Sequence, residues 1–283
     1  MSVRQGEVRA FIDGAFYRMA YVEVGDPAAE PVVCVHGLTR NGRDFEPLML
    51  ALADRFRMIA PDLPGRGRSE WLPRGDLYQP PVYVLALSHL LAAIGRPVMW
   101  VGTSLGGICG MGIAAAAGQP ITRMVLNDIG PHIPAASLAR IREYMMAAPP
   151  SFANLQELET HLRLIHAPFG HLSDARWAEM ARFSARALPD GRLALNYDPK
   201  IAEPMRAQEP KDVEMWGYWD KIRIPVLAIR GAQSDLLLPE TLRRMVASGA
   251  KSLIVPNAGH APALADAASI AAIGAFLSDG LHG

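Results

Sequence analysis

The sequence has few of the features that mark secreted, membrane-bound or nucleic-acid-binding proteins. It contains two cysteines, Cys34 and Cys109, each inside an apolar run, so we expect buried thiols rather than a disulfide framework. Basic and acidic residues both number 28, which leaves no net charge to attract nucleic acid or an anionic membrane. No apolar run is long enough to span a membrane, and residues 1–13 lack a signal-peptide pattern. These absences predict a cytoplasmic protein.

The composition is that of a folded globular protein. The chain has 283 residues, of which 50% are hydrophobic and 20% are charged. This length allows one large domain, or one domain with an insertion. We find no internal repeat and no low-complexity segment. The sequence does not indicate an oligomeric state.

Short apolar runs and helical patterns alternate along the first part of the chain. The runs lie at 32–35, 57–60, 98–101 and 124–128, and the helical patterns at 45–54, 81–94 and 108–117. The alternation resumes near the end, with runs at 225–230 and 252–255 and helical patterns at 239–247 and 267–277. This order predicts an α/β fold, a mainly parallel doubly wound sheet with helices on both faces. Ligands bind beyond the carboxyl ends of strands in such sheets, so we expect the site there.

Residues 131–219 interrupt this alternation. Strand patterns disappear there and helical periodicity takes over, with Asn154 and Glu157 as a capping box and Ser173 as the cap of a helix through Ala187. We therefore expect three parts: residues 1–130 and 220–283 form the core, and residues 131–219 form an inserted helical cap. Most Met, Phe and Trp side chains of this segment should form its own core, and some should line a pocket.

The segment Gly102-Thr103-Ser104-Leu105-Gly106 has the Gly-x-Ser-x-Gly pattern of a nucleophile elbow, between an apolar strand run and a helix of small residues. A serine on so tight a turn has a strained backbone, and its neighbours two positions away must lack side chains, as Gly102 and Gly106 do. The Ser104 hydroxyl would then lie at a helix N-terminus, where free N–H groups favour developing negative charge. The pattern predicts a nucleophilic serine.

Partners for this serine follow later strands. Ser104, Asp235 and His260 occur in the chain order of the hydrolases built on this elbow, which predicts His260 as the base and Asp235 as the acid that orients it. Asp128, at the end of the strand after the elbow helix, is the alternative acid. The backbone N–H groups of Leu38 and Leu105 are the predicted oxyanion hole, and the His36 side chain is interpreted as a brace for the loop that carries Leu38.

Together these motifs resemble the α/β-hydrolase superfamily over nearly the whole chain. They are Val35-His36-Gly37, Asp62-x-x-Gly65-x-Gly67-x-Ser69, Gly102-x-Ser104-x-Gly106-Gly107, Gly231-x-x-Ser234-Asp235 and Gly259-His260. The resemblance implies the α/β-hydrolase fold and a serine hydrolase that cleaves carboxylic esters or lactones of small, largely apolar substrates through an acyl-enzyme. It implies a small-molecule partner, no nucleic acid or membrane partner, and neither a metal nor an organic cofactor.

Other functions stay open as alternatives. C–C bond hydrolases of the meta-cleavage product type share the serine and a helical cap, but usually carry a Gly-rich loop where this chain has Leu38-Thr39-Arg40-Asn41-Gly42. A non-catalytic hydrolase-fold receptor and a structural protein that retains the fold are the alternatives from other classes. Members that open epoxides or displace halide use an aspartate at the elbow, which Ser104 argues against.

Several further side chains have two interpretations each. Arg40 is interpreted as a solvated arginine, and contact with an anionic substrate group is its alternative. Trp216, Tyr218 and Trp219 would be either hinge packing or pocket wall. Four histidines in or near the expected cap do not have the spacing of a metal site: His132, His161, His166 and His171.

Overall fold

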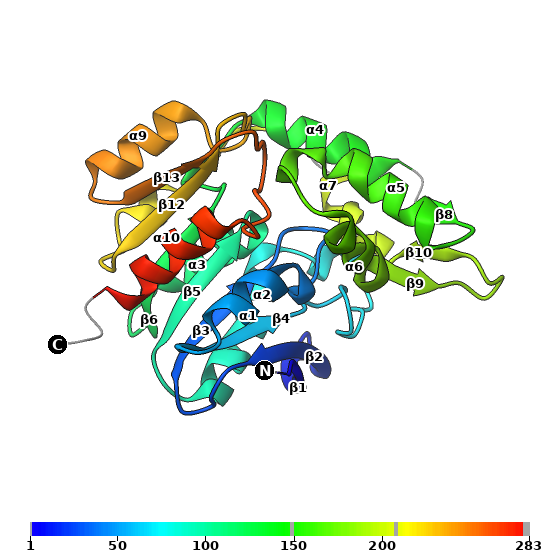
Figure 1. Ribbon diagram of the computed structural model, residues 1–283, viewed down its shortest axis with the longest axis horizontal. Coiled ribbons are helices and arrows are strands. Elements are labelled where there is room, and N and C mark those ends of the chain that lie inside the picture. The colour runs from blue at the N-terminus through cyan, green and yellow to red at the C-terminus, as the bar shows by residue number, and fades with distance from the viewer. Residues whose placement is uncertain (1, 148–149, 207–208, 280–283) are drawn as a thin grey trace.

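An eight-stranded sheet forms the centre of the computed structural model, which describes residues 2–147, 150–206 and 209–279. Its strand order is β1-β2-β4-β3-β5-β6-β12-β13. The strands are β1 (Arg4–Ile12), β2 (Ala15–Val24), β3 (Glu30–Val35), β4 (Phe56–Pro61), β5 (Val98–Thr103), β6 (Ile121–Asn127), β12 (Val226–Gly231) and β13 (Lys251–Val255). Figure 1 shows this sheet with helices against both of its faces.

The sheet is mainly parallel, as the alternation predicted. All pairs from β4 to β13 are parallel, whereas the β1–β2 hairpin and its contact with β4 are antiparallel. Asp13 and Gly14 form the hairpin turn, both with positive φ angles. Parallel strands place their carboxyl ends at one edge, so the residues after β3, β5 and β6 share that edge.

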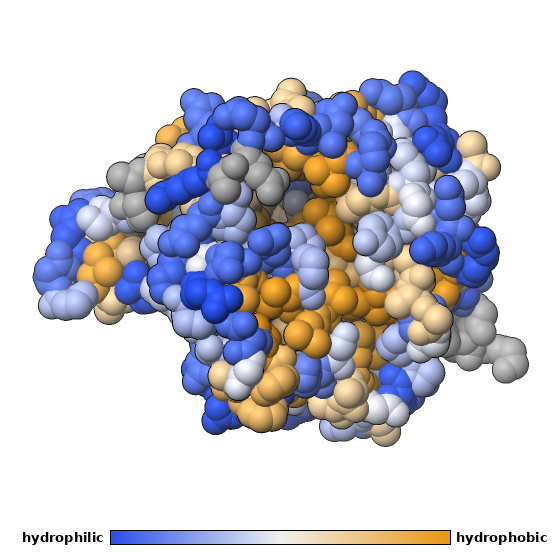
Figure 2. Space-filling model, turned by 180° about the vertical axis from the view of Figure 1, so that it is seen from behind, coloured by the Kyte–Doolittle hydropathy of each residue, from blue (hydrophilic) through white to orange (hydrophobic). Residues whose placement is uncertain are grey.

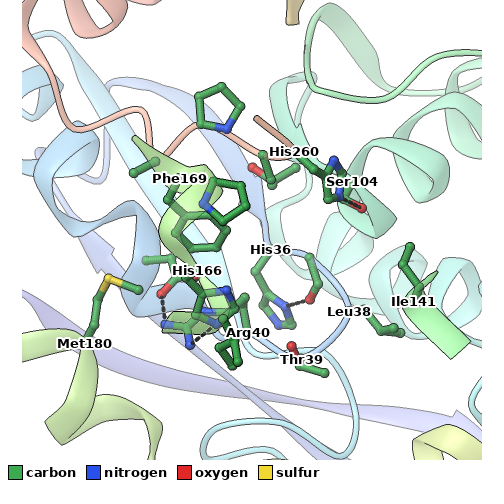
Figure 3. A pocket seen from close by; sticks show the side chains of 18 of the residues that line it. His36, Leu38, Thr39, Arg40, Ser104, Ile141, His166, Phe169, Met180 and His260 are labelled. Carbon is green, nitrogen blue, oxygen red and sulfur yellow. Dashed lines mark hydrogen bonds and ion pairs between the residues drawn. The ribbon is translucent and has the colours of Figure 1, made fainter. Parts of the chain in front are cut away.

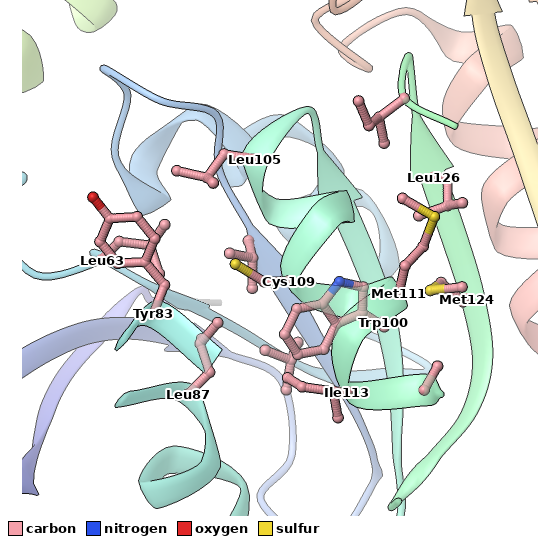
Figure 4. Close-up of a cluster of buried hydrophobic side chains, with 14 of the residues drawn as sticks. Leu63, Tyr83, Leu87, Trp100, Leu105, Cys109, Met111, Ile113, Met124 and Leu126 are labelled. Atoms are coloured by element: carbon pink, nitrogen blue, oxygen red, sulfur yellow. The ribbon is translucent and has the colours of Figure 1, made fainter. Parts of the chain in front are cut away.

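Helices cover both faces because successive strand residues point to opposite sides. On one face, α1 (Glu46–Leu52) and α10 (Ala267–Ser278) pack with Met99 and Val101 of β5. On the other, α2 (Pro80–Ile94), α3 (Leu105–Ala114) and α9 (Pro239–Ala247) pack with Val98 and Trp100. Figure 4 shows Trp100 against α3, where its indole Nε1 donates to the carbonyl of Gly106 at 3.0 Å. This packing fixes the start of α3 against β5.

Residues 131–219 contain more than the predicted helices. The helices are α4 (Ala135–Met146), α5 (Leu155–Ile165), α6 (Asp174–Ser184), α7 (Glu203–Arg206) and α8 (Trp216–Trp219). The expectation that strands disappear was wrong, because short strands form two small sheets: β7 (His132–Ile133), β8 (Ser151–Phe152), β9 (Ala185–Ala187), β10 (Leu193–Leu195) and β11 (Val213–Glu214). Single-turn 3₁₀ helices complete the elements of the chain: η1 (Gly42–Phe45), η2 (Gly75–Leu77), η3 (Ala167–Phe169) and η4 (Pro199–Ala202).

These elements gather on one side of the large sheet, where Figure 1 shows α4 to α7 with β8 to β10. The predicted helix N-cap at Asn154 is present at the start of α5, because the Asn154 side chain accepts from the Glu157 amide at 3.0 Å. Ser173 also caps α6, but that helix ends at Ser184 and β9 follows it. None of the described residues in this segment joins the large sheet. The division into core and cap stays a prediction.

The outer surface is mixed in character. Seen from behind, hydrophobic residues gather around a hollow in the middle of the face and polar residues surround them (Figure 2). Among the described residues, no helix is both long enough and apolar enough to cross a membrane. Cys34 and Cys109 are free and buried, as expected.

Candidate active site

Ser104 lies on the predicted sharp turn between β5 and α3. Its φ and ψ angles are 50° and −112°, a positive φ that non-glycine residues rarely adopt. A Cβ atom at Gly102 would collide with the backbone of Gly106, and one at Gly106 would overlap the carbonyl oxygen of Val35. The two glycines therefore let the elbow pack closely against the sheet.

His260 bridges the serine and a buried carboxylate. Its Nε2 lies 3.1 Å from the Ser104 Oγ, and its Nδ1 lies 2.8 Å from the Oδ2 of Asp128. Asp128 is fully buried, whereas the His260 side chain is 18% exposed. The order serine, imidazole, carboxylate is the one that lets a histidine take the serine proton while the carboxylate holds the ring.

The Asp128 carboxylate has several further donors. Its Oδ1 accepts from the Gly231 amide at 2.9 Å. Its Oδ2 accepts from the Ser234 hydroxyl at 2.6 Å and from the Ala261 amide at 3.2 Å. Such donors stabilise a buried charge and fix the direction in which the carboxylate faces His260.

Asp235 does not lie in this site, so the prediction that it is the acid was wrong. Its carboxylate forms a forked ion pair with Arg140, with N–O distances of 2.7 and 2.9 Å, and its side chain is 51% exposed. The turn after β12 directs Ser234 inward to Asp128 and leaves Asp235 on the outside. The alternative, Asp128, takes the position beside His260 because β6 lies between β5 and β12 in the sheet.

The loop after β3 carries Leu38, which lines the same two cavities as Ser104, and a Cβ atom at the preceding Gly37 would lie 3.8 Å from the Ser104 Cβ. The buried His36 ring braces this loop, because its Nδ1 lies 2.7 Å from the carbonyl oxygen of Gly37 and its Nε2 accepts from the Leu63 amide at 2.9 Å. Burial lowers the pKa of His36 to about 3, so the ring is neutral. The loop-brace interpretation is confirmed.

Arg66 is a second brace for this loop that sequence reasoning missed. Its guanidinium is fully buried, its Nε donates to the carbonyl of Leu38 at 2.8 Å, and its Nη1 donates to the Tyr83 hydroxyl at 2.7 Å. It belongs to the Gly65-x-Gly67 segment, in which the sequence motif specifies the two glycines but not the residue between them. Leu105 is the first residue of α3, where backbone N–H groups have no partner within the helix.

Two cavities meet at Ser104. The smaller, of about 280 Å³, contains His260, and the larger, of about 760 Å³, contains Leu105, while Leu38 and Ile141 line both. The larger cavity lies between α2, α3 and residues of the inserted segment. The smaller one extends to α5 and α6, with Phe169 and Met180 in its wall (Figure 3).

Arg40 is buried in the wall of the smaller cavity, so its interpretation as a solvated arginine was wrong. Its Nε and Nη2 both donate to Asp44, at 2.8 and 2.7 Å, and its Nη1 lies 3.4 Å from the Nε2 of His166. Figure 3 shows Arg40 and His166 next to each other, across the cavity from Ser104. Burial comes first and the Arg40 charge second in lowering the pKa of His166 well below its ordinary value, which leaves this ring neutral.

The three aromatic residues near the return to the core divide between the two predicted roles. Trp219 is buried and its Nε1 donates to the Ser248 hydroxyl at 2.8 Å, whereas Tyr218 lines the larger cavity. The guanidinium carbon of Arg244 lies over the Trp216 ring, 3.5 Å from the centroid of that ring. Within the ranges that the structure describes, no three His, Cys, Asp or Glu side chains are placed to hold a metal ion.

Comparison with known proteins identifies the family. Residues 32–273 match the model of the alpha/beta hydrolase family. The chain is 41% identical over 282 residues to the 3-hydroxybutyrate-oligomer hydrolase of Cupriavidus necator, which covers 95% of this chain and 96% of that protein. It is 29% identical over 253 residues to the pimeloyl-[acyl-carrier protein] methyl ester esterase of Stenotrophomonas maltophilia, with 85% and 90% covered.

A solved structure agrees over almost the full length. An alpha/beta hydrolase from Novosphingobium aromaticivorans superimposes with a TM-score of 0.87 at 34% identity, covering 98% of both chains. The elbow at Ser104, the parallel sheet and the matched residues thus lead to one conclusion: the chain belongs to the alpha/beta hydrolase family.

Proposed function

We propose that the protein is a serine hydrolase that cleaves the ester bonds of short 3-hydroxybutyrate oligomers. The observation that carries this proposal is the hydrogen-bonded series from Ser104 through His260 to Asp128, on a strained elbow at the junction of two cavities. The substrate class is supported by the Cupriavidus necator relative, which resembles this chain over almost its full length.

The reaction begins with acyl transfer to the serine. His260 takes the Ser104 proton as the Oγ attacks the ester carbonyl, and Asp128 stabilises the imidazolium that forms. The N–H groups of Leu38 and Leu105 donate to the carbonyl oxygen as it becomes negative, and one such donor lowers the barrier by about 3 kcal/mol. His260 then gives its proton to the leaving alkoxide oxygen as the C–O bond breaks.

Water completes the cycle. It enters beside His260, which removes its proton as the oxygen attacks the acyl-enzyme carbonyl. Collapse of the second tetrahedral intermediate returns the proton to the Ser104 Oγ and releases the acid. The protein groups that act in these steps are the side chains of Ser104, His260 and Asp128 and the backbone N–H groups of Leu38 and Leu105. The inserted segment supplies one wall of each cavity, and we assign it the role of a cap that determines which substrates fit.

The test is a hydrolysis panel with the wild-type protein and Ser104→Ala. The panel contains the dimer and trimer of 3-hydroxybutyrate, p-nitrophenyl esters from acetate to decanoate, several lactones and a meta-cleavage dienoate. We expect oligomer hydrolysis by the wild type and a loss of about 10³-fold or more in the variant.

The other arms of the panel distinguish the alternatives. Turnover of the dienoate alone would favour the C–C bond hydrolase, and turnover of lactones alone would favour a lactonase. Absence of any turnover would favour a non-catalytic receptor. Activity of Ser104→Ala equal to the wild type would contradict the mechanism.

A further inference from the structure

The position of the catalytic groups assigns the two halves of an ester to different cavities. The leaving oxygen must lie near His260, which gives it a proton, and His260 lines the smaller cavity. The acyl carbonyl must lie near the amides of Leu38 and Leu105, and Leu105 lines the larger cavity. The alcohol half therefore extends into the smaller cavity and the acyl half into the larger one.

The two cavities differ in charge. Among the described residues, the smaller cavity is lined by three arginines, Arg40, Arg140 and Arg176, and by one carboxylate, Asp44. Asp235 and Glu179, which pair with Arg140 and Arg176, are outside this lining. The larger cavity has two basic and two acidic residues in its wall: Arg142, Lys211, Glu209 and Asp212. Each arginine has an acidic partner, but the guanidinium groups outnumber the carboxylates in the wall on the alcohol side, an arrangement that suits an anionic group.

Arg40 and His166 are the side chains of this wall that suit such a group. Because Asp44 occupies the Nε and Nη2 of Arg40, the hydrogens of Nη1 are left for other partners. Arginine can only donate, so the His166 Nε2 that faces Nη1 accepts, and the proton of this neutral ring is on Nδ1. Arg40 and His166 come from different elements and thus lie next to each other in the cavity wall, across from Ser104 (Figure 3).

An oligomer of 3-hydroxybutyrate has one carboxylate, at its carboxyl end. When the ester bond nearest to that end is cleaved, the unit that carries the carboxylate leaves as the alcohol. We propose that Arg40 and His166 bind this carboxylate, so that the protein removes single hydroxy acid units from the carboxyl end of the oligomer. This inference rests on the proposed function. The larger, mostly apolar cavity then holds the acyl remainder, which carries no charge.

A comparison of two dimers tests the carboxylate contact. The wild-type protein is assayed with the 3-hydroxybutyrate dimer as the free acid and as its methyl ester, which differ in the charge at this end. We expect kcat/KM to be at least about tenfold higher for the free acid, the size of one charge-assisted hydrogen bond. Equal values would overturn the inference while leaving the ester hydrolase intact, and hydrolysis of neither dimer would instead overturn the proposed function.

Variants connect this preference to Arg40. The double variant Arg40→Gln with Asp44→Asn replaces the buried ion pair by uncharged groups of similar size, and Arg40→Lys keeps the charge but loses the fork. We expect the acid-to-ester ratio to fall about tenfold in the first and several-fold in the second. The control is Arg43→Lys, which changes an arginine paired with Glu46 that is not among the described residues lining either cavity. An unchanged ratio in both Arg40 variants would contradict the contact.

The end from which units leave is tested with a trimer acetylated at its hydroxyl end. Cleavage from the carboxyl end first gives 3-hydroxybutyrate and the acetylated dimer. Cleavage from the other end first gives acetylated 3-hydroxybutyrate and the free dimer, and this outcome would overturn the assignment of the cavities.

Discussion

At the scale of single residues, the site depends on where one carboxylate is held. Asp128 is fully buried and accepts from a histidine, a hydroxyl and two amides, whereas Asp235 is half-exposed and pairs with an arginine. The mechanism needs a carboxylate that keeps one His260 tautomer in place. Only the first of these two environments can do so.

Substitution of the two aspartates separates these roles. We expect Asp128→Asn to lower kcat by about 10³–10⁴-fold, because the amide stabilises the wrong tautomer of His260. Asp235→Asn removes an exposed ion pair and should change kcat less than about threefold. The measurement is steady-state hydrolysis of a p-nitrophenyl ester with all three proteins. A large loss in Asp235→Asn with little loss in Asp128→Asn would contradict the assignment.

His36 gives a pH dependence of stability. Burial lowers its pKa in the folded protein to about 3, below the ordinary value of 6.5. Between these values the unfolded chain binds a proton that the folded chain does not, so the free energy of unfolding falls as the pH falls. The contribution of this site to the slope approaches about 1.4 kcal/mol per pH unit midway between the two values and fades out by about one pH unit above 6.5.

Urea unfolding at pH 7.5, 6 and 5 measures this contribution. We expect His36→Gln to be less stable than the wild type at pH 7.5, because both loop contacts of the ring are disturbed. Its stability should nevertheless fall less steeply between pH 6 and 5. The same slope in both proteins would mean that His36 is not the group that takes up the proton.

At the scale of elements, the β5–α3 elbow tolerates little change. Gly106→Ala introduces a Cβ into the carbonyl oxygen of Val35, so β3 or the helix must move. We expect a loss of several kcal/mol in the free energy of unfolding, with loss of activity. The matched control is Gly112→Ala in the same helix, where the nearest atom lies at 3.6 Å. It should stabilise the protein by about 0.5–1 kcal/mol. Equal melting temperatures for the two variants would contradict this account.

The elements also show how far the sequence alone predicts this protein. Apolar runs and helical periods predicted the six parallel strands of the central sheet and its helices, because burial on one or both faces leaves a direct pattern in the sequence. The short strands β7 to β11 have two or three residues each, too few for any period to be visible. β9 and β10 pair as a local hairpin, whereas β8 pairs with β10 and β7 pairs with β11 across more than 40 residues.

The same limit applies to side chains of the site. Ser104 and His260 were predictable because local motifs carry them. Asp235 follows its strand as Asp128 does, and only the direction of the turn at Ser234 distinguishes the two. Arg40 lies in a polar loop, but its side chain contacts His166, and the neighbouring Asn41 donates to the Phe183 carbonyl. Both partners are more than 120 residues away, so the sequence does not indicate that Arg40 is buried.

At the scale of the whole molecule, the inserted segment and the sheet edge together form two cavities of unequal size and charge. If the acyl half occupies the larger one, narrowing that cavity should affect long acyl groups most. We expect Ile108→Phe, on the α3 wall, to lower kcat/KM for the trimer about tenfold more than for the dimer. Leu164→Phe, on an exposed part of α5, is the control. An equal loss for both oligomers would indicate that the acyl half lies elsewhere.

The central claim is that Ser104 is the nucleophile of an ester hydrolase, and covalent trapping tests it most directly. A p-nitrophenyl phosphonate mimics the tetrahedral intermediate and leaves a stable adduct on an activated serine. Peptide mass spectrometry of the treated protein should locate one adduct on Ser104, formed in parallel with loss of esterase activity and much more slowly in Asp128→Asn. Loss of activity with an unmodified Ser104, or an adduct on another residue, would contradict the account.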